Sequence, residues 1–137
     1  MSEKFDAETL TITLDNDTWI TSANDQALHA AIPEEFGGVP HGATPEHLFA
    51  LSILNCYLAT FKVISKKSGY AFKSLSGTIT VELESNAEPP INKAEIHVEL
   101  QGDQTHGEKI AQKALQHCYV HQSVKTPVHV LVNGEDI

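Results

Sequence analysis

Apolar and polar side chains alternate with a period of two near the start of the chain, which is typical of β-strands. Three apolar residues alternate there with β-favouring threonines, so a strand is expected through Leu10, Ile12 and Leu14. A turn-forming Asp-Asn-Asp run follows, and residues 18–22 are expected to return as a second strand. Residues 27–32 are expected to form a third strand, before a Gly- and Pro-rich loop at 33–42.

The pattern then changes to a long apolar helix. Thr44 is placed to cap it, Pro45 suits its first position, and Glu46 puts an acid in its first turn. Residues 48–64 are apolar on almost every face, so this helix is expected to be buried centrally. Two lysines and then Gly69 predict its end.

Two further alternating runs predict an antiparallel hairpin with one wet face. The first run carries apolar residues at 79, 81 and 83, the second at 94, 96, 98 and 100, and turn residues 86–90 lie between them. A second helix is expected from about His106 to about Cys118, followed by a short strand at 128–132. This order predicts an α+β fold, in one domain over residues 1–137.

The composition and net charge of the chain exclude some classes of binding partner. The 137 residues include nine lysines, no arginine and eighteen acidic residues, which gives a net charge of −9. Neither a basic stripe nor an array of phosphate contacts can be built from this set, so we expect no nucleic-acid partner and no anionic-membrane partner.

The chemical state of the two cysteines depends on the compartment in which the protein is located. The N-terminal residues lack a secretory signal pattern, and the apolar run 48–61 is shorter than the about 20 residues of a membrane span, so a cytoplasmic protein with no membrane span is expected. Disulfides are uncommon in that reducing compartment, so Cys56 and Cys118 are expected to be free, catalytic or metal-bound.

Both thiols are expected to point inward from the two helices, where they could meet. Cys56 shares a helical face with Ser52, Ala59 and Val63, and Cys118 follows the apolar spacing of the second helix. Three interpretations remain open: small apolar side chains in a core, a redox pair, or part of a metal site.

The metal interpretation rests on His117, Cys118 and His121, whose i, i+4 histidines share one face of the expected helix. The set has no obvious fourth ligand, so we expect no metal and no cofactor. His41, in the Gly- and Pro-rich loop, could sit over a cleft.

Two motifs resemble the OsmC/Ohr family. Residues 44–56, which run from Thr44-Pro45-Glu46 to Cys56, resemble the family's first-cysteine helix, and Cys118-Tyr119-Val120-His121 resembles its second-cysteine motif. Residues 35–38 are similar to the glycine-bearing loop that precedes the helix in many members. The length and the order of elements fit as well.

The resemblance implies an intertwined homodimer, in which two central helices pack against antiparallel β-sheets from both chains. It also implies a thiol-dependent peroxidase that reduces organic hydroperoxides and is itself reduced by an external dithiol. Cys56 would be the peroxidatic nucleophile and Cys118 the resolving thiol. Glu46 matches the acid that helps to hold the family's catalytic Arg, and helix geometry predicts that it acts near the partner's thiol.

The chain departs from the family in two respects. It has no Arg to activate the thiol, and Tyr119 stands where the second motif has Pro. His41 or a lysine could replace the Arg as the cation, but no pattern in the sequence places either one beside the thiol. The alternative function is a non-catalytic protein of the same fold that binds a small apolar ligand.

Overall fold

The computed structural model describes residues 3–13 and 15–137 of the chain. These residues form two compact units, 1–49 and 50–137. The long helix α1 (Pro45–Ser68) begins in the first unit and continues through the second. The expectation of one domain over the whole chain stays a prediction.

The first unit is a three-stranded antiparallel sheet in the order β1-β2-β3. The strands β2 (Thr18–Ala23) and β3 (Gln26–Ala31) confirm two expected strands. Asn24 and Asp25, both at positive φ, form the two-residue turn that matches the twist of such a hairpin.

The first expected strand is shorter than its pattern indicates. The strand β1 covers Glu8–Thr9, and Leu10 adds one more backbone hydrogen bond, from its N–H to the carbonyl of Ile20. Residues 11–13 join no strand, and Leu14 lies outside the described residues. A 3-10 turn, η1 (Glu34–Phe36), interrupts the expected loop at 33–42.

This first unit buries very little. Among its described residues, only Ala30 and Ala31 are buried. Seven large apolar side chains are exposed instead: Phe5, Leu10, Ile12, Ile20, Leu28, Ile32 and Phe36. Small sheets need a packed apolar face to be stable, so this sheet requires cover from outside the unit.

The helix α1 has the ends that its sequence predicts. The N–H of His47 donates to Oγ1 of Thr44 at 3.1 Å, which is a side-chain cap. Gly69 takes φ +71° directly after the last turn, a conformation that favours glycine. The single chain does not cover every face of this apolar helix, because Leu51 and Val63 are 44% and 51% exposed.

Length and composition alone would let α1 cross a membrane, and no other helix in the described part of the chain meets that test. A third of its most apolar window is buried against the rest of the protein. Core helices of water-soluble proteins pass the same test, so this is weak evidence for a membrane span.

The second unit contains a four-stranded sheet in the order β4-β5-β6-β7. The strands β4 (Ser74–Leu83) and β5 (Ile91–Gln101) form the expected antiparallel hairpin, and alternate residues of β5 are buried. The expected last strand is β6 (Val128–Val132), and a short β7 (Glu135–Asp136) follows. One pair departs from the expected antiparallel sheets, because β6 pairs parallel to β5. Two helices connect these strands, and such a crossover brings the chain back in the same direction.

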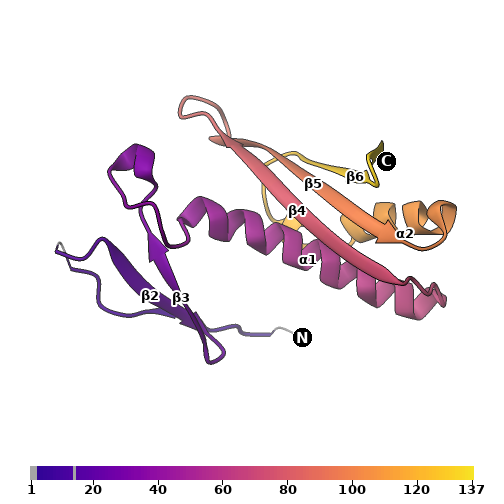
Figure 1. Ribbon diagram of the computed structural model, residues 1–137, viewed down its shortest axis with the longest axis horizontal. Helices are drawn as coiled ribbons and strands as arrows, with labels where there is room; N and C mark the ends of the chain where they lie inside the picture. The colour runs from indigo at the N-terminus through magenta and orange to yellow at the C-terminus, as the bar shows by residue number, and fades with distance from the viewer. Residues whose placement is uncertain (1–2, 14) are drawn as a thin grey trace. The chain divides into compact units, whose positions relative to one another are not determined.

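In Figure 1, α1 runs along one face of the β4–β5 hairpin. Gly77 makes this approach possible: a Cβ there would lie 3.2 Å from Cδ1 of Leu54 on α1. The second helix, α2 (Gln104–Gln116), is fixed to α1 by the Tyr57 hydroxyl, which donates to the Ala111 carbonyl at 3.0 Å. The helix α2 ends before Cys118, and a one-turn helix, α3 (Tyr119–Gln122), begins directly after that cysteine.

Candidate functional site

The two cysteine thiols lie in contact in the second unit. Cys56 is half-buried in the middle of α1, and Cys118 is completely buried at the junction between α2 and α3. Both are free thiols, and their side chains form a hydrogen bond with each other. The sequence-based expectation placed Cys118 within the second helix, whereas the structure places it outside both helices.

The break at Cys118 brings backbone N–H groups to the Cys56 sulfur. Cys118 has an extended conformation, with φ −76° and ψ 108°, and α3 begins with the next residue. The first N–H groups of a helix have no partner within the helix. Those of Tyr119 and Val120 form hydrogen bonds with the Cys56 thiol.

These bonds determine the acidity of Cys56. Burial alone raises the pKa of its thiol. Four hydrogen-bonding groups outweigh burial and lower that pKa below its ordinary value of 9.0: the N–H of Val120, the Cys118 thiol, the Thr60 hydroxyl and the N–H of Tyr119. Hydrogen bonds donated to a thiolate stabilise its charged form. Cys56 is therefore the more nucleophilic of the two cysteines at neutral pH.

Cys118 has the opposite tendency. Burial, together with the negative charge of the neighbouring Cys56, raises the pKa of its thiol to about 11. At neutral pH, Cys118 is protonated and donates its hydrogen to the Cys56 sulfur. The pair is thus a half-buried thiol with a lowered pKa beside a completely buried, protonated one.

The four groups that lower the pKa of Cys56 are all uncharged in their ordinary state, and no lysine or histidine is among them within the described residues. Sequence reasoning considered only a cation, His41 or a lysine, as the group that could replace the Arg, and it missed these neutral groups. Thr60 could have been found, because it lies four residues after Cys56 on the same helical face. The N–H groups of Tyr119 and Val120 leave no signal in the sequence, since every residue except proline has one.

Glu46 lies in the first turn of α1, in the first unit. It is half-buried, and its Oε1 atom is buried without a hydrogen-bond partner among the described residues. The pair His117 and His121, expected on one helical face, falls on either side of the junction between α2 and α3. No three His, Cys, Asp or Glu side chains in the described ranges gather in a way that could hold a metal ion.

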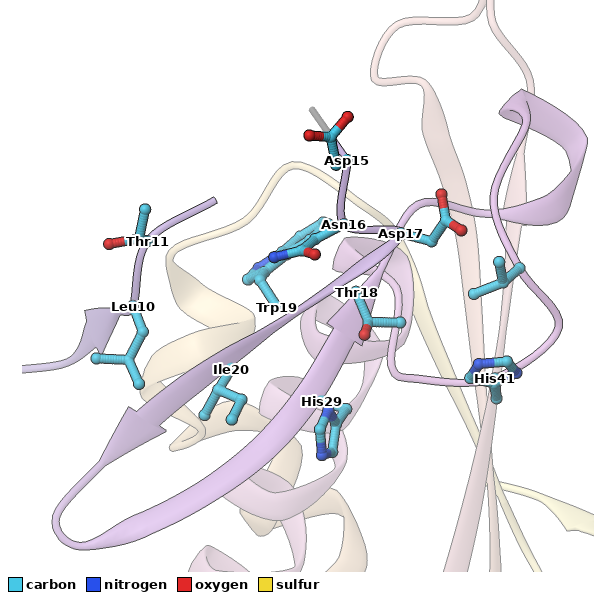
Figure 2. Close-up of a pocket in the computed structure, with 11 residues that line it drawn as sticks. Leu10, Thr11, Asp15, Asn16, Asp17, Thr18, Trp19, Ile20, His29 and His41 are labelled. Carbon is cyan, nitrogen blue, oxygen red and sulfur yellow. The ribbon is translucent and has the colours of Figure 1, made fainter. Parts of the chain in front are cut away.

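Each unit has a cavity. His41 lines one of about 570 Å³ in the first unit, with His29, Trp19 and the acids Asp15 and Asp17. Figure 2 shows the two carboxylates at one end of this cavity, and the two imidazoles separate from each other. The second unit has a cavity of about 480 Å³ beside the thiols, lined in part by Thr60 and Tyr119.

A model of the family described as "OsmC-like protein" matches residues 37–133, which include both cysteines. The chain belongs to the OsmC family. This confirms the resemblance seen in the two cysteine motifs. No curated protein sequence matches the chain.

Solved structures share this OsmC fold over nearly the whole chain. An OsmC-like protein of unknown function from Vibrio cholerae superposes with a TM-score of 0.83 at 16% identity, covering 96% of this chain and 99% of that one. An organic hydroperoxide resistance protein OsmC from Legionella pneumophila gives 0.75 at 21% identity, covering 95% of each chain.

A third structure is a putative organic hydroperoxide resistance protein from Vibrio cholerae, with captopril bound in one of its active sites. It gives a TM-score of 0.79 at 21% identity, covering 100% of this chain and 97% of that one. At these identities the likeness establishes the α+β fold.

Proposed function

We propose that this protein is a thiol-dependent peroxidase that reduces organic hydroperoxides, with Cys56 as the nucleophile and Cys118 as the resolving thiol. The observation that carries the proposal is the contact between the two thiols together with their opposite shifts in pKa, downward for Cys56 and upward for Cys118. Membership of the OsmC family and the names of two similar structures support the same reaction.

The proposed reaction proceeds in three steps. The Cys56 thiolate attacks the outer oxygen of a hydroperoxide, the O–O bond breaks, and the alkoxide takes a proton to leave as an alcohol, so that Cys56 becomes a sulfenic acid. The Cys118 sulfur then attacks the Cys56 sulfur and expels hydroxide, which combines with the thiol proton of Cys118 as water. An external dithiol reduces the resulting disulfide by exchange and is itself oxidised.

The chain performs this reaction without an Arg, because neutral donors stabilise the thiolate instead. Two of them are the N–H groups of Tyr119 and Val120, which are held in place by the helix turn that begins after Cys118. Further parts of the proposal are a homodimer in which Glu46 acts near the partner's thiol, and a cytoplasmic location, where dithiol reductants keep thiols reduced.

The test measures consumption of cumene hydroperoxide with dithiothreitol by the wild type, Cys56→Ser and Cys118→Ser. The wild type should turn over repeatedly, and after peroxide without reductant its mass should fall by two hydrogens per chain. Cys56→Ser should fall to the uncatalysed rate. Without reductant, Cys118→Ser should react once and then gain oxygen on Cys56, because no second thiol of the chain is left to condense with the sulfenic acid. A wild type that leaves peroxide unreacted, with two free thiols, would contradict the proposal.

The absence of Arg favours one rival function, which is a non-catalytic protein that binds a small apolar ligand on the same fold. The same experiment separates the two functions. A ligand-binding protein should consume no hydroperoxide, and Cys56→Ser should leave its behaviour unchanged.

A further inference from the structure

The lysines of this chain are separated from its acidic residues. Seven of the nine lysines lie in two stretches, residues 47–81 and 104–134, and these stretches contain a single acidic residue, Glu108. The first stretch includes most of α1, and the second includes α2 and α3. The helices of the second unit therefore carry positive charge in a protein whose net charge is −9.

The helix α2 has one exposed face that is polar and positively charged. We define the polar face of α2 by five exposed residues: Lys109, Gln112, Lys113, Gln116 and His117. Neither lysine of this face has an ion-pair partner in the described part of the chain. No large apolar side chain of α2 is exposed, so a dimer that forms by covering apolar surface leaves this face accessible.

The spacing of the two lysines is unfavourable for the helix itself. Lys109 and Lys113 are four residues apart, and like charges at this spacing repel each other and destabilise a helix. The helix dipole favours Lys113, which lies in the last turn, but Lys109 lies outside that turn, where the dipole has little effect. A negatively charged partner would remove this repulsion, so the polar face of α2 is suited to an acidic surface.

The polar face of α2 leads directly to the two thiols. Lys113 and Lys109 precede Cys118 by five and nine residues, so both lie within about 20 Å of it along the chain. A typical protein interface buries about 800 Å² on each partner, which corresponds to a patch about 30 Å across. One protein partner can therefore contact both lysines and reach the thiols at the same time.

We propose that the polar face of α2 is the docking surface for the protein that reduces the Cys56–Cys118 disulfide, and that this partner is an acidic protein carrying a dithiol. The inference rests on the proposed function, whose last step needs an external dithiol. Because most of the remaining chain is acidic, the lysines of α2 steer such a partner to this side of the molecule.

The electron transfer follows ordinary thiol–disulfide exchange. One thiolate of the partner attacks the Cys56 sulfur, which is the more exposed of the two, and Cys118 leaves and takes a proton. The second thiolate of the partner then attacks the partner's own sulfur in the mixed disulfide. This releases Cys56 as a thiolate and leaves the partner oxidised to a disulfide.

The test measures how fast two dithiol peptides reduce the disulfide at low ionic strength. Both peptides contain Cys-Gly-Gly-Cys, flanked on each side by glutamates in one and by serines in the other. The disulfide is first formed with cumene hydroperoxide, and free thiols are then followed by alkylation and mass spectrometry. The proteins are the wild type, Lys109→Gln/Lys113→Gln, and Lys4→Gln/Lys93→Gln. The last variant is the matched control, because it removes the same charge from two exposed lysines outside the helices.

Lys109→Gln/Lys113→Gln should slow reduction by the glutamate peptide about tenfold and leave reduction by the serine peptide unchanged. The control variant should change either rate by about twofold at most. High salt should remove the difference between the proteins, because it screens exposed charges.

Equal slowing with both peptides, equal slowing in the control variant, or no slowing would overturn the inference and leave the peroxidase reaction standing. Unchanged peptide rates, together with binding of oligouridylate that requires both lysines, would overturn it in favour of a nucleic-acid partner. A wild type that forms no disulfide with hydroperoxide would overturn the proposed function instead. The disulfide is then made with diamide, and the same comparison of rates decides whether α2 steers an acidic dithiol to it.

Discussion

At the residue scale, the acidity of Cys56 depends on neutral hydrogen-bond donors that surround its sulfur. Burial opposes the thiolate, and the donors from Val120, Cys118, Thr60 and Tyr119 outweigh burial. Each such bond favours the charged form, so removing one should raise the pKa of the thiol. The Thr60 hydroxyl also donates to the Cys56 backbone carbonyl at 2.7 Å, so its one hydrogen is shared between that carbonyl and the sulfur. Thr60 can be altered with little change of shape, because valine has nearly the same volume.

Thr60→Val should therefore raise the pKa of Cys56 and slow its reaction at neutral pH. The measurement is the rate of alkylation by iodoacetamide as a function of pH, with mass spectrometry to assign each thiol. In the wild type, the Cys56 rate should reach half its maximum below pH 9.0, and Cys118 should stay protonated until about pH 11. Thr78→Val, on the exposed face of β4, is the control and should leave both profiles unchanged. A Thr60→Val profile identical to the wild type would show that the hydroxyl does not stabilise the thiolate.

At the element scale, the site depends on how α1 and α2 are held together. The Tyr57 side chain is completely buried on α1, and its hydroxyl donates to the carbonyl of Ala111 in α2. Burial also raises the pKa of Tyr57, so the hydroxyl stays protonated and remains a donor at neutral pH. This bond fixes α2, which ends two residues before Cys118, against the helix that carries Cys56.

Tyr57→Phe should lower the free energy of unfolding by about 1 kcal/mol, the typical net value of one buried hydrogen bond. Urea unfolding followed by circular dichroism measures this difference. Tyr119→Phe is the matched control, because Tyr119 is 79% exposed, and it should change stability very little. Equal stability of the two variants would show that the Tyr57 hydroxyl contributes nothing to the packing of the helices.

At the scale of the whole molecule, both units leave apolar side chains uncovered. The first unit exposes seven large apolar residues, and α1 exposes Leu51 and Val63 in the second. A second copy of the chain would cover such surfaces, so we predict a stable homodimer. Sedimentation at micromolar concentration should give twice the chain mass of 15.0 kDa. A monomer under these conditions would contradict the prediction.

The same dimer should place each Glu46 near the Cys56 of the partner. Ten residues of helix separate the two positions within one chain, about 15 Å along the axis, so the side chain does not reach its own thiol. The measurement is the activity of a mixed dimer with Glu46→Ala in one chain and Cys56→Ser in the other. A cross-chain site leaves one site intact, and about half the wild-type activity should survive if the two sites are independent. Activity as low as that of the single-variant homodimers would refute the assignment.

The sequence by itself determined the elements whose signals are local. Thr44 and Gly69 set the ends of α1, because a side-chain cap and a left-handed glycine act within one turn. The alternation around residues 79–83 and 94–100 predicted the hairpin and its buried face. The two cysteine motifs led to the OsmC family, whose model matches residues 37–133.

The tertiary structure decided what depends on contacts between distant segments. Three features of the structure correspond to no local pattern in the sequence. They are the end of α2 before Cys118, the parallel pairing of β6 with β5, and the N–H groups at the Cys56 sulfur. Each results from how the crossover through α2 and α3 packs on α1 and the sheet. The sequence thus identified the two thiols, whereas the packing determined which thiol is acidic, because acidity depends on burial and on donors from elsewhere in the chain.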